Sequence, residues 1–204
     1  AMDTSSTLVL ISLETVFLVF LQFSPRLLND FLARKLCHAG SGLMMVFLDP
    51  DVPLARYYVY VVVVSSITMT WELVPILPKF RFGAVRDAGI TGYLALVGVW
   101  FFLQYPPRVL APLFFADPAG AVVGKALTRA GYNAPLYENK TVGGTAAVFL
   151  MGFCSLPQEI CDWGVAAQAG VAAAVALAEL FGGRDYDNLV IAAVVLVVWF
   201  AATA

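Results

Sequence analysis

Long apolar runs separated by short polar segments are the feature that most constrains this chain. Runs that approach the thickness of a bilayer occur at residues 7–23, 36–49, 57–77, 88–105, 108–127, 142–157, 164–181 and 188–204. The composition agrees, because 61% of the residues are hydrophobic and 13% are charged, against about 45–50% and about 25% in soluble domains. The sequence therefore predicts an all-α, polytopic transmembrane helical bundle of about eight spans, with residues 1–204 forming a single domain.

The twelve Lys and Arg residues fall unevenly between the two sides that eight spans define. Ten follow spans one, three, five and seven or close span five, whereas Arg56 and Arg108 lie in the other loops. Since cytoplasmic loops carry the excess of basic residues, we expect the ten to face the cytoplasm or an equivalent compartment. Both termini would then lie on the opposite side. The net charge of −2 offers no basic field, so nucleic acid is not an expected partner.

Four groups of polar residues interrupt the apolar pattern, and charges at membrane depth are functional candidates. The first is "RKLCHAGSG", where Arg34 and His38 are four residues apart and share a helix face,. Arg34 and Lys35 could bind phosphate, and His38 could accept a proton. The alternatives are that Arg34 and Lys35 are interfacial anchors and that His38 makes a hydrogen bond between helices.

The second group is "DPAGAVVGKALTR", at the end of the fifth run. Asp117, Gly124 and Lys125 fall on one helical face,. A carboxylate suits Mg²⁺ and an ammonium suits phosphate oxygens. Pro118 indicates a helix start or break at this point. The alternative is a buried Asp117–Lys125 ion pair.

The third group is "ENKTVGGT", which leads into the sixth run. Asn139 or Thr141 could cap a helix there, and the free amides of a helix N-terminus bind phosphate. The candidate phosphate-binding residues are Lys140, Thr141, Gly143, Gly144 and Thr145. A capped loop without any ligand is the alternative.

The fourth group is "ELFGGRDYDN", where oxygen ligands for a divalent cation gather. Glu179, Asp187 and Asn188 are the candidate metal ligands, and Glu72 is a possible addition from the third run. For Asp185 we favour an ordinary solvated acid. All four groups fall on the same predicted side of the membrane, so the sequence predicts one polar pocket that holds both phosphate and metal.

These motifs together resemble a known family. "RKLCHAGSG" is similar to its RK-x-x-H element, "ADPAGAVVGK" to its GD-x-x-A-x-x-x-G-[RK] element, "NKTVGGTAAVF" to K-[ST]-x-x-G-[ST], and "AELFGGRDYDNLVI" to its closing E…DN-[LIV]-x-[IV] element. Order and spacing match over residues 33–204. The set resembles the polyprenol/phytol kinase family, which includes dolichol kinases and CTP-dependent diacylglycerol kinases and is related to CDP-diacylglycerol synthases. The chain departs from the pattern at Ala116, where the family has Gly, and at Pro118.

The resemblance implies phosphoryl transfer from a nucleoside triphosphate, CTP in this family, to the hydroxyl of a membrane lipid alcohol, with Mg²⁺ as cofactor. Asp117, Glu179 and Asp187 would hold Mg²⁺ on the triphosphate, and Asp117 or His38 would accept the hydroxyl proton. Isoprenoid alcohols and diacylglycerol both remain open as substrates. The alternative functions are a cytidylyltransferase that makes a CDP-lipid, a transporter, and a non-catalytic membrane scaffold.

Overall fold

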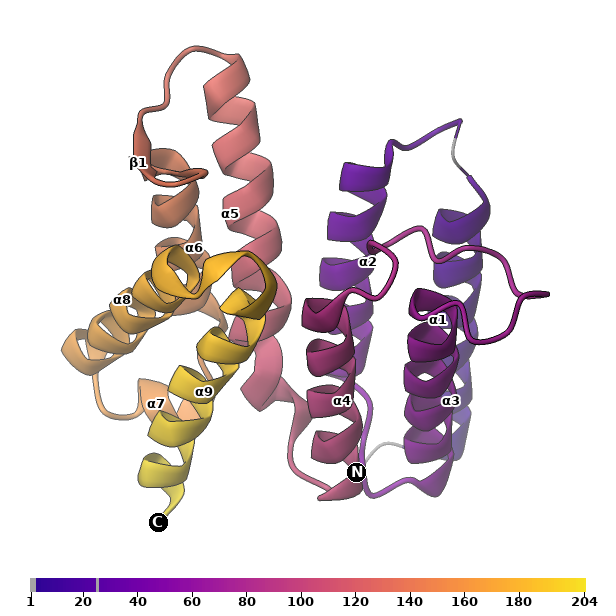
Figure 1. Ribbon diagram of the computed structural model, residues 1–204. Coiled ribbons are helices and arrows are strands. Elements are labelled where there is room, and N and C mark those ends of the chain that lie inside the picture. Colours follow the sequence, from indigo (N-terminus) through magenta and orange to yellow (C-terminus); the bar gives the residue numbers. More distant parts are fainter. Residues whose placement is uncertain (1–2, 25) are drawn as a thin grey trace. The chain divides into compact units, whose positions relative to one another are not determined.

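The computed structural model describes residues 3–24 and 26–204, apart from the side chains of Arg184 and Asp185. The chain is mostly helical, at 73% of its residues, which confirms the predicted helical class. It divides into two compact units, Ala1–Pro107 and Arg108–Ala204, and each unit is described by itself below (Figure 1). The expectation of a single functional domain stays a prediction.

The first unit is built from four helices. They are α1 (Thr4–Phe23), α2 (Asp30–Met45), α3 (Pro53–Thr70) and α4 (Ala88–Phe102). Three of them begin at an acid or amide that caps the first turn, because Asp3, Asn29 and Asp87 each accept a hydrogen bond from the amide three residues later,. Helix α3 instead begins at a proline, which lacks the N–H that would otherwise be unsatisfied,. Helix α3 packs on α4, and α1 packs on α2 and α3.

The second unit begins within a short 3₁₀ turn at Pro107–Leu110. Its elements are α5 (Ala111–Arg129), β1 (Pro135–Tyr137), β2 (Lys140–Thr141), α6 (Val142–Ser155), α7 (Gln158–Cys161), α8 (Val165–Phe181) and α9 (Gly183–Thr203). Helices α5 and α6 make the most extensive contact, and α8 packs on both α6 and α9 (Figure 1). The strands β1 and β2 form a small antiparallel hairpin between α5 and α6, which an all-α prediction did not include.

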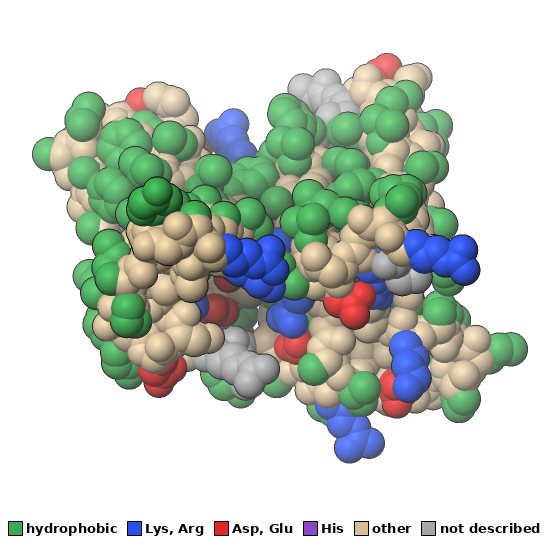
Figure 2. All heavy atoms as spheres, turned by 90° about the horizontal axis from the view of Figure 1, so that it is seen from above, with side chains coloured by type: hydrophobic (Ala, Val, Ile, Leu, Met, Phe, Trp, Pro, Cys, Tyr) green, Lys and Arg blue, Asp and Glu red, His purple; other side chains and the backbone are tan. Residues whose placement is uncertain are grey.

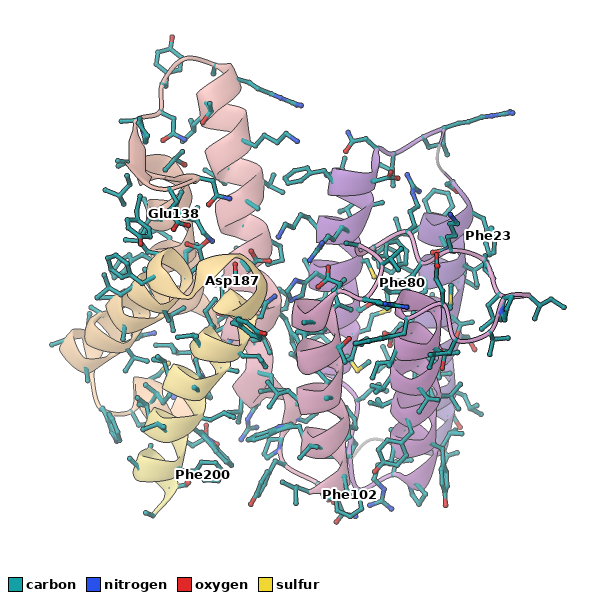
Figure 3. The ribbon with its side chains drawn as sticks, viewed as in Figure 1. Phe23, Phe80, Phe102, Glu138, Asp187 and Phe200 are labelled. Carbon is teal, nitrogen blue, oxygen red and sulfur yellow. The ribbon has the colours of Figure 1, made fainter. Side chains whose placement is uncertain are left out.

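Large apolar side chains are exposed along many of the helices. Val16 of α1 is 69% exposed and Val197 of α9 is 70% exposed. Phe102 and Phe200, labelled in Figure 3, lie near the ends of α4 and α9 and are also exposed. Hydrophobic side chains cover much of the face seen in Figure 2. Exposure of this kind fits a surface whose solvent is lipid rather than water.

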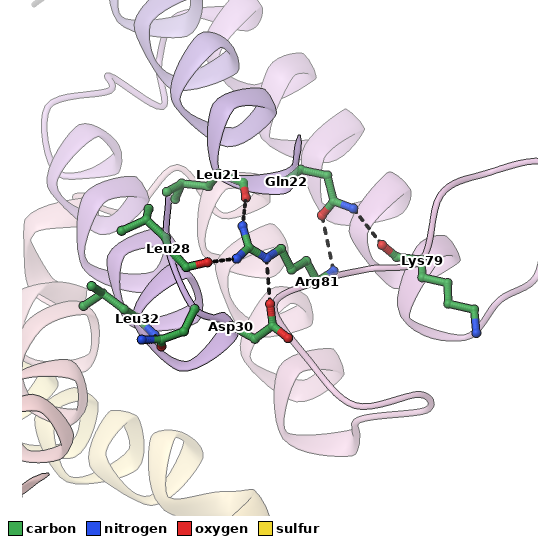
Figure 4. A network of polar contacts seen from close by, with 8 residues as sticks. Leu21, Gln22, Leu28, Asp30, Leu32, Lys79 and Arg81 are labelled. Carbon is green, nitrogen blue, oxygen red and sulfur yellow. Dashed lines mark hydrogen bonds and ion pairs between the residues drawn. The ribbon is translucent and has the colours of Figure 1, made fainter. Parts of the chain in front are cut away.

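Arg81 ties the long segment after α3 to the helices α1 and α2 (Figure 4). Its guanidinium donates to the carbonyl oxygens of Leu21 and Leu28 and to the Asp30 carboxylate, the last at 2.8 Å between Nε and Oδ1. The Arg81 amide donates to the side-chain oxygen of Gln22. The guanidinium thus meets the negative end of the α1 dipole and the acid at the start of α2. The sequence assigned Arg81 only a role in membrane orientation.

Each predicted apolar run contains a helix, but several boundaries were wrong. Helix α2 begins at Asp30 rather than near residue 36, because the Asn29 cap lets the polar segment before the run join the helix. Helix α3 ends at Thr70, and the predicted continuation to residue 77 is a turn in which Glu72 has a φ of +50°. Helix α5 runs straight through Pro118, so the predicted start or break at that residue was wrong.

Among the described residues, three helices are long and apolar enough to cross a membrane. They are Thr4–Phe23, Pro107–Arg129 and Tyr186–Thr203. The helices α4, α6 and α8 are apolar but shorter. Candidate spans are therefore present, which supports a membrane protein, while the count of eight and the location of the termini stay predictions.

Candidate functional site

Three carboxylates from three helices of the second unit converge on one point. An oxygen of Asp117 in α5, one of Glu179 in α8 and one of Asp187 in α9 all lie within 4.8 Å of one another. Asp117 is 6% exposed and Glu179 is 5% exposed. Figure 3 shows Asp187 near the start of α9. Acids are rarely buried together without a cation, because each desolvated charge repels the next.

Helix α5 presents Asp117 on its most buried stretch. Ala116, Asp117 and Pro118 are all buried, as is Gly120 one turn later. Pro118 removes one N–H, the donor that would reach the carbonyl of residue 114, and α5 continues through it. Ala116, where the resemblance calls for Gly, is fully buried. Neither departure from the family pattern breaks the helix that carries Asp117.

A glycine turn between α8 and α9 sets Glu179 and Asp187 side by side. Gly183 has a φ of +78°, a conformation that favours glycine,. A Cβ on Gly182 would lie 2.5 Å from the carbonyl oxygen of Ala178 and 2.7 Å from the Cα of Asp187. The two glycines therefore permit the tight reversal that brings the acids together.

Lys140 in β2 joins the acids. Its ammonium forms ion pairs with Glu179 and, at 3.3 Å, with Oδ2 of Asp187. Burial opposes the charged form of Lys140, but the hydrogen bond and charge of Glu179, followed by those of Asp187, outweigh it and raise the pKa above its ordinary value of 10.5,. Lys140 is therefore cationic throughout the physiological range.

The composition of this cluster suits a divalent cation. Three carboxylates and one ammonium leave two net negative charges when all are ionised. The side-chain oxygen of Asn188, the residue after Asp187, is buried and has no hydrogen-bond partner among the side chains that the structure describes. Carboxylate and amide oxygens are the ligands that Mg²⁺ takes. The donor set therefore fits the predicted cofactor, with Asp117, Glu179, Asp187 and Asn188 as the residues to hold it.

The start of α6 is capped by side chains, and Thr141 is the cap that the sequence allowed. The Thr141 hydroxyl accepts from the amide of Gly144 at 3.3 Å, and the side-chain oxygen of Asn133 accepts from the amide of Gly143 at 2.9 Å. Both amides are thus engaged by the protein. A phosphate group at this helix start would have to replace these two hydrogen bonds.

Glycines hold α5 and α6 close together. A Cβ on Gly124 would lie 2.9 Å from the Thr141 hydroxyl and 3.3 Å from the Cα of Gly144, and a Cβ on Gly144 would lie 3.0 Å from the carbonyl oxygen of Gly120. The space beside these glycines is occupied by the facing helix. Their first role is therefore close helix packing, and the phosphate-binding role of Gly124 and Gly144 stays a prediction.

Two further residues of this unit were predicted to bind phosphate, Lys125 and Thr145. Lys125 is exposed, so the alternative of a buried Asp117–Lys125 pair was wrong. Eight residues of helix separate the two by about 12 Å along the axis. Thr145 lies one turn into α6, and its hydroxyl oxygen is buried with no hydrogen-bond partner among the described residues.

The predicted residues Arg34, Lys35, His38 and Glu72 belong to the first unit. Arg34 is exposed and pairs with Asp87 at 3.4 Å, and Lys35 is half-buried. The His38 ring contacts that of Tyr93 edge-on, with centroids 4.7 Å apart. Glu72 is exposed just beyond α3. A shared pocket of these residues with the acids of the second unit stays a prediction.

Two polar residues that none of the predicted motifs contains are conspicuous in the structure. Asn133 links the α5 end to the α6 start, because its amide nitrogen also donates to the carbonyl of Gly124 at 2.9 Å. Glu14 in α1 is fully buried, and neither of its carboxylate oxygens has a hydrogen-bond partner within the described part of the chain. An acid inside the first apolar run was a readable signal for Glu14. Asn133 stands in a short polar loop, where no comparable signal is present.

Comparisons of the chain with protein-family models, with curated proteins and with solved structures found no match. The family resemblance of the four motifs therefore stays a prediction. The geometry of the second unit is what supports a function.

Proposed function

We propose that this protein is an integral membrane enzyme that transfers the γ-phosphoryl group of a nucleoside triphosphate to the hydroxyl of a lipid alcohol. The observation that carries the proposal is the convergence of Asp117, Glu179 and Asp187 with Lys140 in the second unit. CTP as the donor comes from the motif resemblance alone.

Phosphoryl transfer asks a protein mainly to position the reactants and to neutralise charge. Asp117, Glu179 and Asp187 would hold Mg²⁺, which would neutralise charge on the triphosphate when bound. Lys140 lies against two of these acids and offers an ammonium to a phosphate oxygen. The apolar, lipid-compatible surface of the same unit suits an acceptor that resides in the membrane.

The lipid oxygen forms a bond to the γ-phosphorus, the bond from that phosphorus to the bridging oxygen breaks, and the nucleoside diphosphate leaves. The hydroxyl proton passes to a base, for which Asp117 and His38 are the two candidates. Lys125 of the second unit would bind a phosphate of the nucleotide or product, and the phosphate-binding role of Arg34 and Lys35 stays a prediction from the sequence.

Isotope position separates this proposal from its nearest alternative. Purified protein in detergent with Mg²⁺ and a panel of lipid alcohols is given CTP labelled at the γ-phosphate or, in parallel, at the α-phosphate. Label from the γ-phosphate in the lipid is the expected result. Label from the α-phosphate instead would indicate a cytidylyltransferase, and no lipid label from CTP or ATP would overturn the proposal.

A further inference from the structure

Glu14 places a carboxyl group half-way along α1, one of the helices that are long and apolar enough to cross a membrane. Its neighbours Leu13 and Val16 are 55% and 69% exposed, whereas Glu14 is 0% exposed. The side chain therefore points away from the lipid-compatible face of α1 and into the first unit, where α1 packs on α2 and α3. An acid at this depth is costly and is a functional candidate by default.

The carboxyl group has no partner that would compensate a negative charge. Among the described residues, nothing donates a hydrogen bond to either of its oxygens. Arg34 and Arg81 of the same unit pair with other acids. A carboxylate enclosed in this way would lose its hydration without a replacement. The position of Glu14 therefore requires either a bound cation or a proton.

Helix α2 places a second unsatisfied polar group against Glu14. Ser41 faces the carboxyl group, and its hydroxyl oxygen is buried without a hydrogen-bond partner in the described part of the chain. The two helices approach closely at this level, since a Cβ on Gly40 would lie 2.5 Å from the ring of Phe17 in α1. Two unsatisfied groups from different helices thus meet at one point inside the unit.

Two titratable groups face Glu14 from the helices that pack on α1. Cys37 lies one turn before Ser41 in α2, and Tyr58 comes from α3. The Tyr58 hydroxyl accepts a hydrogen bond from Thr15 at 3.3 Å. A thiol and a phenol are neutral near pH 7, so neither group supplies a positive charge to Glu14.

The smallest cation is the one that fits this position. Glu14 and Ser41 supply three buried oxygens, whereas Mg²⁺ and Ca²⁺ take about six oxygen ligands or more. A proton needs only one carboxylate oxygen, and the O–H group that it forms can donate to a neighbouring hydroxyl. A water molecule would leave the negative charge in place. The chemistry of the enclosed groups therefore favours a proton.

We propose that Glu14 is an intramembrane proton-binding site, whose carboxyl group keeps a proton at neutral pH and donates it in a hydrogen bond to Ser41. The site joins α1 to α2 through a neutral contact. Loss of the proton would leave a carboxylate enclosed by α1, α2 and α3, so the packing of α1 depends on pH. This inference is independent of the phosphoryl transfer proposed for the second unit.

Infrared spectroscopy of the purified protein in detergent tests the protonation of Glu14 directly. At neutral pH, wild type should show a carbonyl band of a protonated carboxylic acid that Glu14→Gln lacks. The matched control is Glu72→Gln, which removes an exposed acid of the same unit and should keep the band. Other protonated acids contribute equally to all three proteins and cancel in the difference spectra. A difference spectrum of wild type and Glu14→Gln without this band would overturn the proposal.

The pH dependence of unfolding gives a second readout. Folded wild type holds a proton that the unfolded chain, in which Glu14 is hydrated, releases above the ordinary range of a carboxyl group. The unfolding equilibrium constant of wild type should therefore rise about tenfold per pH unit near neutral pH, relative to that of Glu14→Gln. Parallel pH profiles for the two proteins would contradict the proposal.

Ser41→Ala tests the partner of the carboxyl group. The variant should keep the carboxylic acid band of Glu14 but shift it to higher frequency, because the acid O–H group then has no acceptor. This readout separates a hydrogen bond from simple packing of the serine side chain. A band that stays at the wild-type frequency would show that Ser41 does not accept this hydrogen bond.

Discussion

The charged residues of the two units are arranged in opposite ways. In the second unit, acids from α5, α8 and α9 and a lysine from β2 converge within a few ångströms. In the first unit, Arg81 secures helix ends and Arg34 pairs with Asp87 beside the start of α4. Of these first-unit residues, only Arg34 belonged to one of the four polar groups of the sequence. The difference teaches that charge at a helix end is often structural, whereas several acids brought together from separate helices leave a net negative charge that a bound cation would balance.

The largest effect should follow from removing a converging acid. Asp117→Asn keeps the shape of the side chain but withdraws one carboxylate, so we expect transfer to fall at least about 100-fold. The assay is lipid labelling from γ-labelled CTP, with Asp51→Asn, an exposed loop acid, as the control. Activity within twofold of wild type would show that convergence in the second unit is not catalytic.

Lys140 distinguishes a folding role from a catalytic one. Lys140→Met leaves buried acids without their ammonium, which should cost about 3 kcal/mol of unfolding free energy and abolish transfer. Thermal unfolding in detergent measures the stability. Because Mg²⁺ can replace the missing charge, it should raise the midpoint of Lys140→Met more than that of wild type. An equal or smaller shift would argue against a cation site at these acids.

Arg81 provides the matched test in the first unit. Arg81→Met removes donors to the carbonyls of Leu21 and Leu28 and to Asp30, which should cost about 2 kcal/mol. Transfer per folded molecule should stay within twofold of wild type. If Arg81→Met stays folded but loses as much activity as Asp117→Asn, the role of Arg81 is not merely structural and the proposed difference between the two units is wrong.

The smallest effect concerns the glycines between α5 and α6. Gly144→Ala places a methyl group 3.0 Å from the carbonyl oxygen of Gly120 and should cost about 1–2 kcal/mol of stability. Gly170→Ala in α8 meets nothing within 4 Å and should stabilise the protein by about 0.5 kcal/mol. Matching melting temperatures for the two variants would show that α5 and α6 can separate freely.

Periodic hydrophobicity was enough to locate the helices, because each apolar run must form one to satisfy its backbone in lipid. It could not locate their ends. Helix α2 begins before its apolar run because Asn29 caps it. Helix α3 ends at Thr70 although apolar residues follow, and the chain forms a turn there in which Glu72 has a positive φ. Pro118 was misread because one missing N–H is tolerated in a helix buried by its neighbours,.

Part of the candidate site followed from residue chemistry alone. Asp117, Glu179 and Asp187 were named as metal ligands, and the structure brings them together. Lys140 was predicted to bind phosphate, yet its ammonium pairs with Glu179 and Asp187. This pairing could not be predicted, because the partners are 39 and 47 residues away in the sequence and leave no local pattern. The cap from Asn133 and the burial of Glu14 likewise depend on tertiary contacts.

The glycine turn at Gly182 and Gly183 also limits how the chain can vary in length. One residue added just after it would rotate the following helix by about 100° and carry Asp187 out of the cluster. Residues 130–134 before β1 form no regular element, so an added residue there would not rotate a helix that carries one of the acids. Natural and engineered insertions should therefore be tolerated in that loop outside Asn133, and excluded between Phe181 and Asp187.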